Sequence, residues 1–70
     1  MALYSCYAPA HPFPAEMIEA DTGLFARKAY GRKHGFNDTS CIISRREDLI
    51  DDKWRKFTGM APAGWSVVEA

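Results

Sequence analysis

Cysteine is scarce in this sequence of 70 residues: only Cys6 and Cys41 are present, and they lie far apart. A secreted miniprotein held together by disulfides normally has four or more cysteines. The N-terminal stretch has no basic start followed by an apolar run, so it lacks the pattern of a signal peptide. No apolar run approaches the roughly 20 residues that a membrane-spanning helix needs. We therefore expect a cytoplasmic protein with reduced thiols and no membrane partner.

An excess of charge of either sign is lacking as well. Nine Lys and Arg balance nine Asp and Glu, so the formal net charge is zero. This balance argues against a general polyanion binder and against an acidic mimic of DNA, because both depend on a strong field of one sign.

Motifs for catalysis or metal binding are absent too. The candidate metal ligands have none of the short spacings that close a zinc site (Cys6, His11, His34 and Cys41). No serine lies in a nucleophile-elbow sequence, nothing orients a base toward Cys41, and no glycine-rich loop joins a strand to a helix. The sequence therefore predicts no enzyme activity, no metal and no cofactor.

The apolar content, in contrast, is that of a folded domain. Hydrophobic residues make up 47% of the chain, and nine of the 70 residues are Phe, Trp or Tyr. We predict one domain over residues 1–70. A domain of this size buries only about 60% of its unfolded surface, and a homodimer is one way to gain stability. Some of the nine aromatic rings should stay at the surface, where they are available to a partner.

Strands are predicted in four places. Residues 2–8 and 40–45 are rich in aromatic and β-branched side chains, and residues 65–69 form a last apolar run. Residues 15–20 are ambiguous, and we interpret them as a short strand, with a single helical turn as the alternative. Three prolines make residues 9–14 a loop.

Two helices are predicted between these strands. The first covers residues 24–34, begins at a cap on Asp21 or Thr22 and ends at Gly35. The second begins at a capping box from Ser44 to Glu47, and Gly59 ends it. Its apolar stripe consists of Leu49, Ile50, Trp54 and Phe57.

The element order is therefore β-β-α-β-α-β. It predicts an α+β fold, in which a three- or four-stranded sheet is packed on one face by two helices. Trp54 and Phe57 should lie in the core, and in the first helix Phe25 should share the buried face with Ala26, Ala29 and Tyr30.

The strongest functional signal is a set of clustered cations. Arg27, Lys28 and Arg32 fall in one stretch without an acid, and Arg45 and Arg46 lie at the end of the strand predicted at residues 40–45. If the two groups converge, they form a positive patch for an acidic protein surface or for nucleic acid. The alternative is an ordinary solvated helix face whose cations pair with acidic residues of the second helix (Glu47, Asp48, Asp51 and Asp52).

Two aromatic residues are candidate anchors for the same partner. Phe13 lies between two prolines, and a rigid loop loses little entropy when it presents a ring. Trp65 follows a loop that contains proline and glycine, and we expect its ring to be partly exposed.

The stretch from Met17 to Arg45 (MIEADTGLFARKAYGRKHGFNDTSCIISR) resembles the middle of small phage-encoded α+β proteins, including some anti-CRISPR proteins. The shared pattern is a strand, an acidic turn, a helix that contains alanine and ends near an aromatic residue, and another strand. The resemblance implies a stoichiometric inhibitor that blocks a nucleic-acid-processing complex in the host cytoplasm. The alternative function is a small nucleic-acid-binding module that acts through a basic helix face.

Overall fold

The computed structural model describes residues 1–60 and 67–69, and of residues 67–69 only the backbone. Four strands form one sheet: β1 (Ala2–Tyr7), β2 (Glu16–Ala20), β3 (Ile43–Arg46) and β4 (Val67–Glu69). Their order across the sheet is β3-β1-β2-β4. β1 pairs antiparallel with both β2 and β3, whereas β4 is parallel to β2. The strand at residues 15–20 is confirmed, and the helical alternative is excluded.

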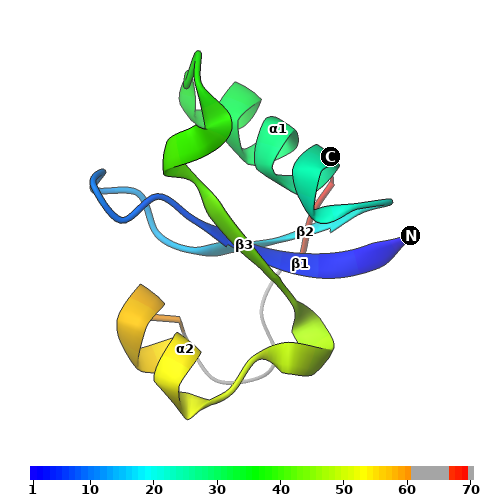
Figure 1. Cartoon of the computed structure of the whole chain (residues 1–70), viewed down its shortest axis with the longest axis vertical. Helices are drawn as coiled ribbons and strands as arrows, with labels where there is room; N and C mark the ends of the chain where they lie inside the picture. The colour runs from blue at the N-terminus through cyan, green and yellow to red at the C-terminus, as the bar shows by residue number, and fades with distance from the viewer. Residues whose placement is uncertain (61–66, 70) are drawn as a thin grey trace.

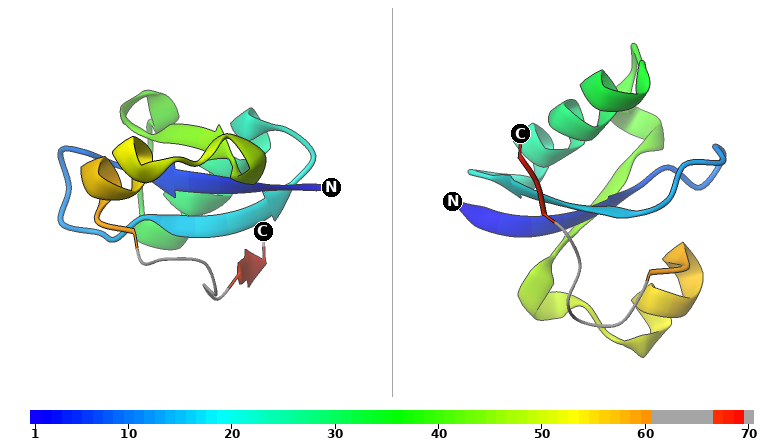
Figure 2. Two further views of the ribbon diagram at one scale, coloured as in Figure 1. Left: turned by 90° about the horizontal axis from the view of Figure 1, so that it is seen from below. Right: turned by 180° about the vertical axis from the view of Figure 1, so that it is seen from behind.

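Two α-helices complete the small α+β fold, α1 (Gly23–His34) and α2 (Asp52–Thr58). The prediction that both pack on one face of the sheet is wrong, because α1 and α2 lie on opposite sides of it (Figures 1 and 2). The cause is the composition of β1. Cys6 faces α1, while the neighbouring Ser5 faces α2, and both side chains are small, uncharged and fully buried. Successive side chains of a strand point to opposite faces, so β1 supports a helix on each side.

The main core lies between α1 and the sheet. Its buried residues come from β1, β2, α1 and the segment before β3 (Cys6, Ala8, Ile18, Ala20, Ala26, Tyr30 and Ile42). Gly31 lies at the closest approach of α1 to this segment. A Cβ atom at this position would be 3.2 Å from Thr39 Cγ2 and 3.3 Å from Ile42 Cδ1. The glycine that weakens α1 by propensity therefore allows α1 to pack closely.

Both ends of α1 follow from local sequence. Thr22 is the N-cap, and its Oγ1 accepts a hydrogen bond of 3.2 Å from the backbone N–H of Phe25. Gly35 ends the helix with φ of 81°, and its N–H bonds to the carbonyl of Gly31. Gly59 ends α2 in the same left-handed conformation, with φ of 70°. These ends confirm the predictions at Thr22, Gly35 and Gly59.

The predicted capping box at Ser44 is wrong. Ser44 lies within β3 and pairs with Cys6 of β1. Residues Glu47–Leu49 form a separate 3-10 turn without a side-chain cap. Asp51 caps α2 instead, because its Oδ1 accepts a 2.8 Å hydrogen bond from the N–H of Trp54. The second helix is therefore shorter than predicted.

The strand predicted at residues 40–45 begins later than expected, at Ile43. Asp38 is responsible, because its carboxylate accepts hydrogen bonds from both the N–H and the hydroxyl of Ser40. These two bonds hold Thr39–Cys41 in a 3-10 turn and keep them out of the sheet. For the last predicted strand, Val67–Glu69 is confirmed, while Trp65 and Ser66 lie outside the described residues. Within the described part of the chain, no helix is long and apolar enough to cross a bilayer.

Candidate functional site

The outward side of α1 carries four exposed residues, which we call the α1 outer surface: Leu24, Phe25, Lys28 and Arg32. Leu24 is 46% exposed and Phe25 is 53% exposed, both high for such apolar side chains. Lys28 Nζ lies 5.8 Å from the centre of the Phe25 ring, in the range of a cation–π contact. Apolar area and positive charge therefore adjoin on one helix face.

The prediction that Phe25 belongs to the buried side of α1 is wrong. Ala26, Tyr30 and Gly31 face the sheet and are buried. At about 100° per residue, this orientation turns Phe25 and Lys28 outward. Ala26 and Gly31 suit the buried side because α1 packs closely on the segment before β3 near Gly31, and the Tyr30 ring fills the core beside them.

Lys28 and Arg32 form no ion pair within the described residues. The three ion pairs there are Lys33–Glu16, His34–Glu16 and Arg46–Asp48. The alternative interpretation, in which the α1 cations pair with the acids of residues 47–52, does not describe Lys28 and Arg32. Residues 47–52 lead from β3 into α2, and α2 lies on the opposite side of the sheet from α1 (Figure 1).

The remaining cations of the predicted patch do not gather in one place. Arg27 lies on the α1 side, where its Nη1 donates a 3.0 Å hydrogen bond to Ser44 Oγ. Arg45 lies on the α2 side, with its guanidinium 5.7 Å from the Trp54 ring centre and its Nε donating to the carbonyl of Leu49 at 2.7 Å. Arg46 pairs with Asp48 at 2.6 Å. The sheet thus separates Arg45 from Arg27, Lys28 and Arg32.

Of the two predicted aromatic anchors, Phe13 and Trp65, the structure describes only Phe13. Phe13 is half-buried rather than exposed, because its ring stacks on His34 at 4.4 Å and meets Phe36 edge-on at 5.8 Å. Trp65 lies outside the described residues. In the stripe expected in the core, Trp54 is buried, but Leu49 and Phe57 are each 56% exposed.

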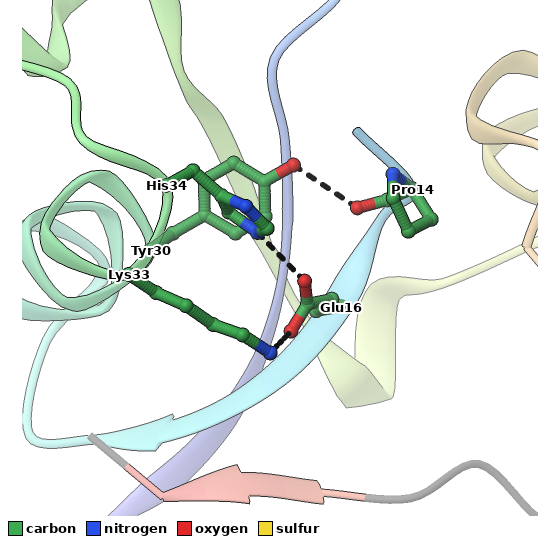
Figure 3. A network of polar contacts seen from close by, with 5 residues as sticks. All are labelled: Pro14, Glu16, Tyr30, Lys33 and His34. Carbon is green, nitrogen blue, oxygen red and sulfur yellow. Dashed lines mark hydrogen bonds and ion pairs between the residues drawn. The ribbon is translucent and has the colours of Figure 1, made fainter. Parts of the chain in front are cut away.

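A polar cluster that the sequence did not predict joins the start of β2 and the loop before it to the end of α1 (Figure 3). The carboxylate of Glu16 bonds to Lys33 with one oxygen and to His34 Nε2 with the other, at 2.7 Å. The Tyr30 hydroxyl donates a 3.0 Å hydrogen bond to the carbonyl of Pro14. Burial raises the pKa of Tyr30 to about 12, so the hydroxyl remains a donor at neutral pH.

This polar cluster has one of the parts of a catalytic site, a carboxylate that orients an imidazole. Among the described residues, however, no hydroxyl or thiol is hydrogen-bonded to His34. The contacts that His34 makes, a hydrogen bond to Glu16 of β2 and stacking on Phe13, fasten the start of β2 and the proline loop onto α1. In the sequence, the only indication of this cluster is the position of Lys33 and His34 in the last turn of α1, where cations suit the helix dipole.

The two cysteines lie in different surroundings. Cys6 is fully buried, and burial raises the pKa of its thiol to about 12. Cys41 is partly exposed, and its Sγ donates to the carbonyl of Asp38 at 3.3 Å. Within residues 1–60 and 67–69, no three His, Cys, Asp or Glu side chains are grouped so that they could hold a metal ion.

Comparison with known proteins gave no relative. No family model, no curated protein and no solved structure matches the chain. Its function is therefore inferred from its own surfaces. The α1 outer surface combines two exposed apolar side chains with two cations that form no ion pair among the described residues.

Proposed function

We propose that this chain is a non-catalytic interaction protein that binds an acidic surface of another protein through the α1 outer surface. The observation that carries the proposal is the juxtaposition on α1 of two exposed apolar side chains with two cations that have no ion pair among the described residues. Interfaces commonly have this composition, an apolar centre with charges at the rim.

The apolar part of this surface is large enough to matter for affinity. An aromatic side chain buries about 150–250 Å² in an interface, so covering the exposed half of Phe25 removes roughly 100 Å² from water. At about 25 cal/mol per Å², this burial is worth about 2.5 kcal/mol. Lys28 and Arg32 contribute mainly to the association rate and to the choice of an acidic partner.

The pattern shared with phage-encoded inhibitors suggests the mode of action. A protein of this kind acts stoichiometrically, by covering a surface that a host nucleic-acid-processing complex needs. The proposal places the chain in the host cytoplasm, with the α1 outer surface as its contact.

A nucleic-acid-binding module is the second candidate, and it is favoured by Lys28 and Arg32, which form no ion pair within the described part of the chain. Two phosphate contacts would give a salt dependence with a log–log slope of about −1.8. Affinity would then fall only about tenfold between 50 and 200 mM salt, whereas proteins that make six to ten phosphate contacts lose about 10³–10⁵. So few contacts give weak binding, and a protein partner therefore accounts better for the exposed Leu24 and Phe25.

The test is partner capture with matched charge reversals. The variant Lys28→Glu/Arg32→Glu should lose the partner, because it replaces two rim cations with acids. The control Lys53→Glu/Lys56→Glu makes the same change in charge on α2, where both lysines are exposed, and should retain the partner. Circular dichroism should show both variants folded. Equal capture by the two variants would refute the assignment to α1.

A salt titration separates the two candidate functions. Binding of duplex or single-stranded nucleic acid at low salt, lost in Lys28→Glu/Arg32→Glu, would support the nucleic-acid module. For a protein partner, Phe25→Ala should weaken binding roughly 60-fold, from the 2.5 kcal/mol estimated above. A Phe25→Ala change without effect would remove the ring from the interface.

A further inference from the structure

A second surface is formed by the outer edge of β3. Among the described strands, β3 is the last on its side of the sheet and pairs only with β1 (Figure 2, left). Residues Ile43–Arg46 make no backbone–backbone hydrogen bond outside that pairing with the rest of the described chain. An antiparallel strand points alternate N–H and C=O groups away from its partner, so this edge can accept another strand.

A half-buried arginine, Arg27, contacts a residue of the same edge strand. Arg27 has one hydrogen bond, from Nη1 to Ser44 Oγ, and no ion pair among the described residues. A guanidinium has five N–H donors in a fixed fork that fits a carboxylate with two parallel bonds. Ser44 is an edge residue of β3, so Arg27 offers donors to whatever pairs with this strand.

We propose that the β3 edge binds an extended acidic segment of another protein as an additional strand. The segment would place an Asp or Glu opposite Ser44, where the carboxylate reaches the Arg27 guanidinium. Directly opposed residues of paired strands have Cβ atoms about 4.5–5.5 Å apart, within reach of this bond.

The other face of the added strand sets a second requirement. Ile43 is half-buried and opposes Tyr7 in the pairing of β1 with β3. In the bound segment, the residue opposite Ile43 is the sequence neighbour of the residue opposite Ser44. Its side chain therefore points to the other face of the sheet, the α2 side. An apolar residue there would extend this contact, so the preferred segment alternates acidic and apolar residues.

The occupant is not a second copy of this chain. Antiparallel pairing of β3 with itself, centred on the strand, would place Arg45 of one copy opposite Ser44 of the other, on the side of the sheet where Arg27 lies. Asp48 neutralises Arg46, but Arg45 has no ion pair among the described residues. This arrangement would bring Arg45 of one copy close to Arg27 of the other, and neighbouring like charges disfavour the pairing, whereas an acidic segment brings a carboxylate to Arg27.

The probe is a capped synthetic peptide that alternates glutamate and valine, titrated into the full chain labelled with ¹⁵N. The alternating peptide should shift the amide signals of residues 43–46 and slow their hydrogen exchange. An isomer with all glutamates at one end should bind at least tenfold more weakly. It cannot place glutamates toward Arg27 on the α1 side and valines toward Ile43 on the α2 side at the same time. A peptide with N-methylated backbone amides should not bind, because it cannot form the strand pairing.

The matched variants separate backbone pairing from general charge attraction. Arg27→Gln should weaken the alternating peptide about tenfold, the factor expected for one lost charge-assisted contact, and Arg27→Lys should fall between Gln and wild type. The Lys28→Glu/Arg32→Glu variant should keep the peptide, so this site can fail or succeed independently of the α1 outer surface. Equal binding of the two isomers, shifts confined to α1, or no binding at millimolar peptide would overturn the proposal.

Discussion

The attachment of α2 to the sheet gives the sharpest test of the structure. Ser5 is fully buried in β1, and its Oγ accepts a 2.9 Å hydrogen bond from Trp54 Nε1. The same hydroxyl donates to the sulfur of Met60 at 3.0 Å. Replacing Ser5 with alanine leaves the indole N–H buried without an acceptor. An unsatisfied buried donor costs about 1–3 kcal/mol, and we expect Ser5→Ala to lower the free energy of unfolding by about 2 kcal/mol.

This loss is large for so small a domain. A chain of 70 residues has a free energy of unfolding of about 4–10 kcal/mol, so the substitution removes a substantial share. The melting temperature should fall by roughly 8–16 °C. Urea unfolding followed by circular dichroism measures the change without relying on tryptophan fluorescence. Ser40→Ala is the matched control, because the Ser40 hydroxyl bonds to Asp38 at the surface, and its effect should stay within about 0.5 kcal/mol.

A double-mutant cycle isolates the hydrogen bond itself. Trp54→Phe also removes buried ring area and should cost about 2 kcal/mol alone. In Ser5→Ala/Trp54→Phe neither orphaned polar group remains, so the double variant should be about 1 kcal/mol more stable than the sum of the single effects predicts. Additive effects within about 0.3 kcal/mol would show that Ser5 and Trp54 do not interact, and that α2 is not held as described.

Three further predictions test other features. Gly31→Val should lower the free energy of unfolding by about 2 kcal/mol, because even a Cβ there would lie 3.2 Å from Thr39 Cγ2; an unchanged urea midpoint would contradict this close packing. In the native protein an aromatic disulfide reagent should modify Cys41, while Cys6, with its pKa raised to about 12 by burial, should react only on unfolding; mass spectrometry showing equal rates would contradict the burial of Cys6. The hydrogen bond from the Trp54 N–H lowers the pKa of Asp51 below 3.8, so its contribution to stability is complete above the unfolded pKa and is lost as pH falls through the folded one. Asp51→Asn should therefore lose less stability than wild type as the pH falls below the usual range of an aspartate pKa, and parallel acid unfolding curves would show that this carboxylate does not contribute.

The features that the sequence predicted correctly are those decided by a few neighbouring residues. Thr22, Gly35 and Gly59 set helix ends through their own side chain or their left-handed backbone. The strand at Ala2–Tyr7 and the proline loop after it also follow from local composition. Each of these signals acts within about one turn of chain and has no competitor nearby.

The beginning of α2 was mispredicted because two cap signals compete. Ser44 with Glu47 matches a capping box, and Asp51 lies three residues before Trp54. The choice depends on β1, which pairs with Ile43–Arg46 and holds Ser44 in the sheet. Pairing between residues about 40 positions apart leaves no local trace in the sequence, so only Asp51 remains available to cap a helix.

The candidate site was predicted in part for the same kind of reason. Lys28 and Arg32 were expected at the surface and are exposed. Phe25 was assigned to the core by its hydrophobicity, but close packing of α1 favours Ala26 and Gly31 there. Which side of α1 is buried depends on the shape of the surface beneath it, and the periodicity of the helix does not contain that information.

The three residues of β4 also have a consequence for aggregation. Val67–Glu69 pair with Met17–Glu19 and occupy the outer edge of β2. Without them, β2 would present an open edge that includes Met17 and Ile18, both apolar. Strands of different molecules pair and aggregate at open apolar edges. Arginines in β3 hinder such pairing, and β2 contains no arginine. Truncation before Val67 should therefore reduce solubility more than stability, because β4 protects β2 from other copies while the core on α1 remains intact.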